Sequence, residues 1–276
     1  MNNLWINKYL TLLYEGKITD ALEYKTENIN PTLYRFERFE ECRLNTLEDS
    51  KIFLSNPTTF NDVFDTKGIY YSEEFIKSFY KKIPNISISL EDLTLALEKV
   101  LNEYYNHCGI TCFTEDINNF PMWWSYADNR RGFCIEYDFS DYKKSNGDFL
   151  KDLHPVIYTS QKFNFEKLMQ PILEQIWSDN SNTNLFPSGI IFHYLLGTIK
   201  HKSWSYEKEW RYIVMSLKGL FEFPVKVQAI YLGDNFLPSN IPRMVEISNK
   251  LNCELYQMTA PNHTEKSYSF IPKKIK

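Results

Sequence analysis

The chain of 276 residues carries 43% hydrophobic and 24% charged residues, which is ordinary usage for a globular protein. Its formal net charge of −4 argues against electrostatic binding of long nucleic acid, although a chain with a negative net charge can still contain a local basic cleft. Five scattered cysteines, no signal-peptide pattern and no apolar run of about 20 residues predict a reduced, soluble, cytoplasmic protein.

The N-terminal third predicts helices followed by strands. Apolar residues at helical spacing over 4–27 predict one or two helices broken at Gly16, so we expect a helical segment over 1–30 ahead of a single α+β domain over 31–272. Within that domain, residues 33–36 and 51–55 favour strands, 45–50 a short helix, and 56–62 a turn rich in Asn, Pro and Asp.

The middle of the chain predicts a long helix and several strands. Leucines over 90–105 form one helical stripe, and Ser89 lies three residues before Asp92 as a capping-box variant. Strands are expected over 109–114, 132–138 and 156–158, with a short helix or turn over 122–126. Helices are expected over 163–177 and 190–200.

The C-terminal third holds the segment most suited to chemistry, Trp204 to Arg211, followed by an apolar strand to Met215. On a strand, residues i and i+2 share a face, so Glu207 and Glu209 are expected to face one cleft. Strands over 225–232 and 254–258 bracket a helix over 241–251, and the tail 273–276 is expected to fray. This irregular order predicts an α+β fold around a central mixed or antiparallel sheet.

Three polar anchors occur at predicted strand ends in the order Arg35, Ser55, then the Glu207–Glu209 pair. An arginine fork can hold phosphate or ribose oxygens, and a serine can orient it. A glutamate can stabilise the oxocarbenium-like cation of a breaking glycosidic bond, while its neighbour deprotonates the nucleophile.

This order, with Ser55 and Thr58 as a Ser-x-x-Thr pair, resembles the arginine, serine/threonine and Glu-x-Glu pattern of ADP-ribosyltransferases. The resemblance implies a split central sheet, NAD as substrate, and transfer of ADP-ribose to a protein, nucleic acid or water. Glu209 would be the principal catalytic residue and Glu207 would activate the acceptor. NAD contacts are expected from Tyr34, Arg35, Ser55, Thr58, Trp124, Tyr126 and Arg131, because aromatic faces stack on rings and arginines meet phosphates.

A second set of motifs is spread over residues 31–235. It includes Phe60-Asn61-Asp62, Trp124-Ser125-Tyr126-Ala127 and the run Trp204 to Arg211, and it resembles a widespread bacterial family of unknown function. Members of that family often occur near phage-defence genes, which implies a defence effector or toxin. This chain has Glu37 where the family usually has a second basic residue, which weakens the case for an anion cradle of several arginines.

Two other classes of function stay open from the residues alone. A non-enzymatic sensor or interaction module would use the Trp- and Tyr-rich surfaces, with Arg211 paired to a glutamate at a structural corner. A metal-dependent nuclease would use Asp62, Asp65 and Glu207 with Lys200 or Lys202. No zinc site is expected, because the two cysteines of the Cys-x-x-x-Cys pair, 108 and 112, lack two further ligands at suitable spacing. Neither the acceptor nor the oligomeric state follows from the sequence.

Overall fold

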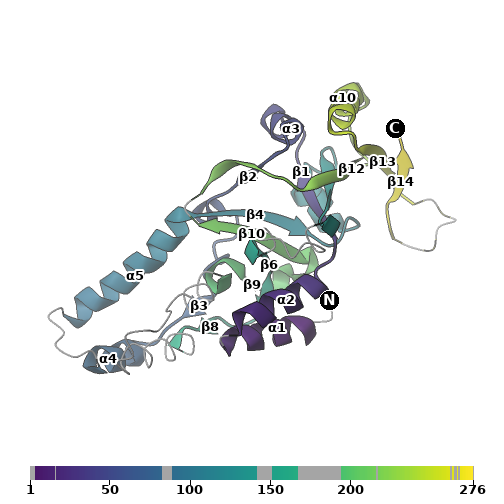
Figure 1. The fold of residues 1–276 in the computed structure, drawn as a ribbon. Coiled ribbons are helices and arrows are strands. Elements are labelled where there is room, and N and C mark those ends of the chain that lie inside the picture. The colour runs from purple at the N-terminus through teal and green to yellow at the C-terminus, as the bar shows by residue number, and fades with distance from the viewer. Residues whose placement is uncertain are drawn as a thin grey trace.

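The computed structural model describes residues 4–15, 17–82, 89–141, 151–166, 194–215 and 217–275, apart from 262, 264, 265 and 267. Its centre is an eight-stranded sheet (Figure 1). In spatial order the strands are β14 (Ile271–Lys274), β13 (Glu254–Thr259), β12 (Lys226–Leu232), β5 (Phe133–Asp138), β1 (Thr32–Glu37), β4 (Cys108–Thr114), β10 (Glu209–Met215) and β6 (Leu153–Pro155). Neighbours are antiparallel except β12 and β13, which confirms the predicted α+β class with a mixed sheet.

The sheet opens between β1 and β4. Strand β1 pairs with β4 at one position, Tyr34 opposite Thr114, whereas its ladder with β5 covers its whole length. The Arg35 side chain spans the opening and donates hydrogen bonds from Nη1 to Thr111 Oγ1 and to the Cys112 carbonyl oxygen. We call this opening the seam; it leaves room for side chains between two halves of one sheet.

Three pairs of short strands surround the sheet. They are β2 (Lys51–Leu54) with β11 (Gly219–Glu222), β3 (Ile69–Tyr70) with β8 (Phe163–Asn164), and β7 (Ile157–Thr159) with β9 (Ile199–His201). Just beyond β2, the backbone of Ser55 exchanges two hydrogen bonds with Ile110, each of 2.9 Å. Ser55 is thereby fixed against the strand that borders the seam.

Helices cover the sheet and its ends. They are α1 (Leu4–Tyr14), α2 (Ile18–Asn28), α3 (Glu41–Glu48), α4 (Glu73–Lys82), α5 (Leu90–His107), α6 (Phe120–Ser125) and α10 (Ile241–Leu251), with 3-10 turns η1 (Pro57–Thr59), η3 (Lys202–Glu207) and η4 (Pro238–Asn240). In Figure 1, α3 and α10 lie together on one side of the sheet and α1 and α2 near β6 and β9. The predicted cap of α5 is confirmed, since Ser89 and Asp92 hydrogen-bond each other's backbone N–H groups.

Burial follows from these positions. Strand β4 has neighbours on both sides and is buried almost throughout, whereas β12 alternates, with Val227 and Ala229 inward. The N-terminal helices join the core through Trp5, whose ring stacks on Trp210 of β10 with centroids 5.7 Å apart. Such aromatic contacts link the helical segment to the strand that carries the charged residues discussed below.

Several boundaries differ from the sequence prediction. The tail does not fray up to Lys274, because β14 pairs with β13 and Lys274 contacts Glu254 at 2.6 Å. Residues 163–164 form β8 rather than opening a helix, and 167–193 lie outside the described residues. Residues 194–198 are helical, but Ile199 already begins β9. The predicted strand over 156–158 corresponds to β7, which begins one residue later, and α3 begins four residues early.

Among the described residues, no helix combines the length and apolar character that crossing a membrane requires.

Candidate functional site

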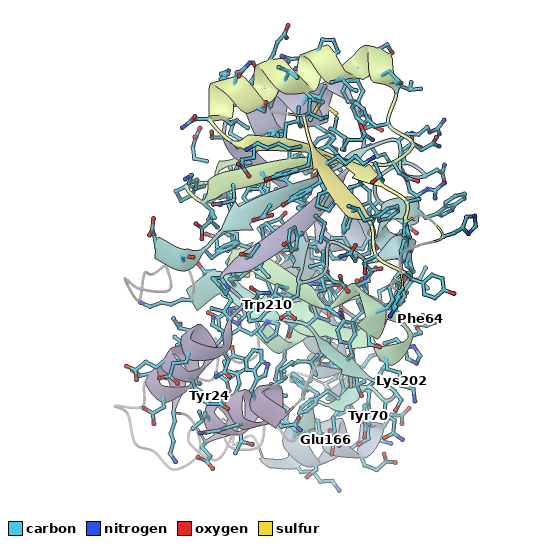
Figure 2. The ribbon with its side chains drawn as sticks, turned by 90° about the vertical axis from the view of Figure 1, so that its right-hand side faces the viewer. Tyr24, Phe64, Tyr70, Glu166, Lys202 and Trp210 are labelled. Atoms are coloured by element: carbon cyan, nitrogen blue, oxygen red, sulfur yellow. The ribbon has the colours of Figure 1, made fainter. Side chains whose placement is uncertain are left out.

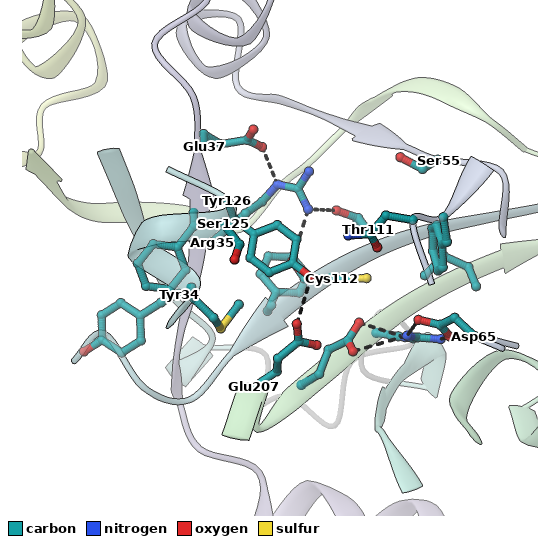
Figure 3. Close-up of a pocket in the computed structure, with 18 of the residues that line it drawn as sticks. Tyr34, Arg35, Glu37, Ser55, Asp65, Thr111, Cys112, Ser125, Tyr126 and Glu207 are labelled. Carbon is teal, nitrogen blue, oxygen red and sulfur yellow. Dashed lines mark hydrogen bonds and ion pairs between the residues drawn. The ribbon is translucent and has the colours of Figure 1, made fainter. Parts of the chain in front are cut away.

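A pocket of about 440 Å³ lies at the seam (Figure 3). Six of the residues expected at a site line it, although they come from four distant parts of the chain: Tyr34, Arg35, Ser55, Tyr126, Glu207 and Glu209. A volume of several hundred Å³ is typical of small-molecule sites. The fold therefore brings the arginine, the serine and the glutamate pair into one cavity.

The two glutamates reach the pocket by a route that differs from the predicted one. Glu207 ends η3, Lys208 adopts a left-handed conformation with φ of 45°, and Glu209 begins β10, so the pair does not share a strand face. Hydrogen bonds fix this turn: Thr114 Oγ1 donates to the Glu207 carbonyl at 2.6 Å, and the Glu209 N–H donates to Tyr158 Oη at 2.9 Å. A tight turn, rather than strand pleating, aims both carboxylates inward.

Lys200 of β9 stands between the carboxylates. Its Nζ lies 2.6 Å from Glu207 Oε2, 2.9 Å from Glu209 Oε2 and 3.4 Å from Asp65 Oδ2. Arg211 binds Asp65 through both terminal nitrogens, at 2.8 and 2.7 Å, and Glu209 through Nε at 2.9 Å. We call these five residues the charge cluster. Their side chains are at most 5% exposed, so each charge depends on its partners.

The charge cluster shifts the pKa values of Glu207 and Glu209 in opposite directions. Burial and the neighbouring Glu209 raise the pKa of Glu207, against the effect of Lys200. Burial alone would raise the pKa of Glu209, but Arg211 and Lys200 outweigh it and hold that pKa well below the usual range. Glu209 therefore stays ionised, while Glu207 takes up a proton more readily than Glu209 does. With all groups ionised, three carboxylates face two cations and leave one net negative charge.

The opposite side of the pocket is basic. Arg35 Nε binds Glu37 Oε1 at 2.6 Å, and Arg43 of α3 lies 3.6 Å from the other Glu37 oxygen. Arg38 also lines the pocket. The fold places two further arginines, Arg38 and Arg43, in the pocket with Arg35. Because Glu37 pairs with both Arg35 and Arg43, it offsets part of their positive charge, and its weakening of an anion cradle stays a prediction.

Tyr126 connects the two sides. Figure 3 shows its ring between Arg35 and Glu207, and its hydroxyl donates to Glu207 Oε1 at 2.8 Å. The hydroxyl also lowers the pKa of Glu207, although the net shift is upward because burial and Glu209 act more strongly.

Three residues predicted to contact NAD lie away from this pocket. Thr58 donates its hydroxyl to Asn56 and lines a neighbouring cavity. The Trp124 ring is 60% exposed, and Arg131 pairs with Asp128 on the surface at 3.1 Å. Trp123, its neighbour in the chain, is fully buried in the core. Neither tryptophan lines the pocket.

Three members of the charge cluster had no predicted role in NAD chemistry. Asp65 and Lys200 entered only the nuclease hypothesis, and Arg211 only the structural one. The fold joins Asp65 and Lys200 to Glu207 as the nuclease hypothesis requires, but Asp62 lines a different cavity and Lys202 is exposed. Among the described residues, no group of three His, Cys, Asp or Glu side chains has the arrangement of a metal site.

Fold and site together define a mixed α+β protein with a charged pocket at the seam of its sheet. A family model described as a protein of unknown function (DUF2971) matches residues 122–212, from α6 into β10. An uncharacterised domain is therefore present over that range, which includes Tyr126, Lys200 and both glutamates. Neither the curated proteins nor the solved structures gave a match to this chain.

Proposed function

We propose that the pocket binds NAD and that the protein breaks the bond between nicotinamide and ribose, as an ADP-ribosyltransferase or NAD glycohydrolase. The observation that carries the proposal is the meeting of Arg35 and the two glutamates around one cavity. The pocket has a basic side and an acidic side, and NAD has matching parts, because its diphosphate is anionic and its nicotinamide ring is cationic. The basic side, with Arg35, Arg38 and Arg43, suits the diphosphate, and the charge cluster suits the nicotinamide ribose.

The different pKa shifts support different roles for the glutamates. As the glycosidic bond breaks, its electron pair leaves with neutral nicotinamide and positive charge develops on the ribose. Glu209, held ionised by Arg211 and Lys200, suits stabilisation of that charge. Glu207, with its raised pKa, suits proton transfer: it accepts the proton of the hydroxyl, amine or water whose lone pair forms the new bond to ribose. This division agrees with the roles that the ADP-ribosyltransferase resemblance implies.

The proposal is tested by incubating the pure protein with NAD and measuring free nicotinamide by chromatography and NAD affinity by calorimetry. We expect binding, together with nicotinamide release above the uncatalysed rate. If neither NAD binding nor nicotinamide release is detected, with protein, RNA and DNA acceptors present, the proposal is wrong.

Tyr126→Phe should shift the pH dependence of ADP-ribose transfer to the acceptor or to water. A general base must be ionised, so the rate is expected to rise with pH through the pKa of Glu207. The Tyr126 hydroxyl lowers that pKa, so its removal should move the acidic limb of the pH–rate profile to higher pH. An acidic limb that stays in place or moves to lower pH would show that Glu207 is not the titrating base.

A second candidate function, a sensor or interaction module, is favoured by one observation. Glu209 is bound by Arg211 at 2.9 Å within a fully buried network, as a purely structural corner would require. In that case the pure protein leaves NAD intact, and substitutions of Glu209 change the melting temperature alone.

If the enzyme proposal holds, we extend it to a defence effector or toxin. Expression of the wild-type chain in bacteria should then deplete cellular NAD and slow growth, and Glu209→Gln should relieve both effects. Magnesium-dependent cleavage of RNA or DNA with NAD left intact would instead favour the nuclease hypothesis.

A further inference from the structure

A second pocket, of about 300 Å³, borders Lys200 of the charge cluster. Its walls come from the turn that contains Phe64 and Lys67, from the segment 159–162 after β7, and from β9. Lys200 lines both pockets, since its Nζ meets Glu207 and Glu209 while the residue also borders this second space. The two cavities therefore share one residue as a wall.

The ionisable residues that line this second pocket are Lys67, Lys162, Lys200 and His201, with no carboxylate among them. In a chain with a net charge of −4, such a local excess is notable. Lys67 and Lys162 are exposed, and neither has a carboxylate partner within the described part of the chain. Lys200 is neutralised by the cluster, so two lysines remain available to an anionic ligand.

An exposed aromatic ring accompanies these lysines. Phe64 lines the pocket and is 65% exposed, which is unusual for so large an apolar side chain. Figure 2 shows Phe64 and Lys202 on the same flank of the molecule. Lysines beside an exposed aromatic ring match the two chemical elements of single-stranded nucleic acid, a phosphate backbone and bases whose faces are free to stack. An acidic peptide would use the lysines without needing the ring, and a duplex keeps its base faces covered.

We propose that this basic pocket binds single-stranded nucleic acid, with phosphates at Lys67 and Lys162 and a base against Phe64. Its use as the acceptor for ADP-ribose rests on the function proposed above, because the shared residue Lys200 sets the pocket beside Glu207. The binding itself does not depend on that function. A net negative charge of the whole chain is compatible with it, because recognition occurs at a local cleft.

Fluorescence anisotropy with labelled 12-residue oligodeoxythymidine and oligouridine, without NAD, tests the binding. The wild-type protein is expected to bind at least one of them, with an affinity that falls as salt rises. In Lys67→Ala/Lys162→Ala the slope of log K against log salt should become shallower by about 0.7 for each phosphate that a lysine no longer neutralises. Phe64→Ala should weaken binding about tenfold without changing that slope.

The matched control is Lys226→Ala/Lys273→Ala, which removes the same charge from exposed positions on β12 and β14 and should bind like wild type. The proposal is overturned if neither oligonucleotide binds, if the two double variants behave alike, or if polyglutamate binds as tightly as the oligonucleotides. Nicotinamide release is measured separately. Release without oligonucleotide binding overturns the binding proposal and the acceptor role but leaves the proposed function standing. Binding without release overturns the proposed function, and the acceptor role with it, but leaves the binding site standing.

Discussion

Arg211→Met is expected to lower the free energy of unfolding by about 3–5 kcal/mol, which is a large part of the stability of a typical domain. Arg211 is fully buried and binds Asp65 with two nitrogens and Glu209 with a third. Methionine fills similar space but leaves the three buried carboxylates of the cluster with Lys200 as their remaining cation. Uncompensated buried charge is among the few single-site changes that cost this much. Urea denaturation measures the loss as a lower midpoint with an unchanged slope.

The control for this prediction is Arg131→Met. Arg131 also pairs with an aspartate, Asp128 at 3.1 Å, but both side chains are more than 40% exposed, so the loss should stay below about 1 kcal/mol. Equal effects of the two substitutions would contradict the importance of the buried network. If Arg211→Met does not fold, Asp65→Asn probes the same network and should also destabilise far more than Arg131→Met does.

Glu209→Gln is expected to reduce nicotinamide release by about 10²–10³-fold, the usual cost of losing one electrostatic contact to a transition state. Glutamine preserves the volume and can still meet Arg211, but it no longer offers a negative charge to the ribose cation. Glu207→Gln should instead abolish transfer to an acceptor while affecting glycosidic cleavage less, because its proposed task is proton transfer. Quantifying free nicotinamide and labelled acceptor in parallel separates the two.

Glu136→Gln serves as the matched control. Glu136 is a partly buried carboxylate on β5 that accepts a hydrogen bond from Tyr231, and it does not line the pocket. Its substitution should leave nicotinamide release unchanged. A melting curve for each variant shows whether lost release reflects lost folding. A folded Glu209→Gln protein with wild-type release would refute the assigned role.

Local patterns predicted much of the fold. The helix α10 begins and ends where the periodicity places it, and the cap at Ser89 follows from the chemistry of two side chains three residues apart. The strand that carries Glu209 was also predicted, because an apolar run follows it. Each of these features depends on residues near one another in the sequence, which is the information that a single sequence contains.

The features that were mispredicted depend on distant partners. The tail forms β14 because it finds the free edge of β13, and nothing in the tail itself encodes that edge. Glu207 lies in a 3-10 turn because Thr114, far away in the chain, binds its carbonyl. Lys200 has no local signature as the centre of a charge cluster, since its three carboxylate partners meet only after folding. The chemistry of Arg35, Ser55 and the glutamates led us to expect them in one site. It did not predict that Lys200 and Arg211 would neutralise the glutamates.

The seam also has a mechanical consequence. Elsewhere in the central sheet a ladder of several residue pairs joins each strand to its neighbours, whereas β1 and β4 share a single pair, so main-chain pairing is weakest at the seam. Arg35 crosses the seam with its side chain, which can rotate without breaking main-chain hydrogen bonds between strands. A ligand that contacts Arg35 on one side of the seam and Glu207 on the other would bridge the two halves of the sheet. Ligand binding should then slow the hydrogen exchange of backbone amides on both sides of the seam.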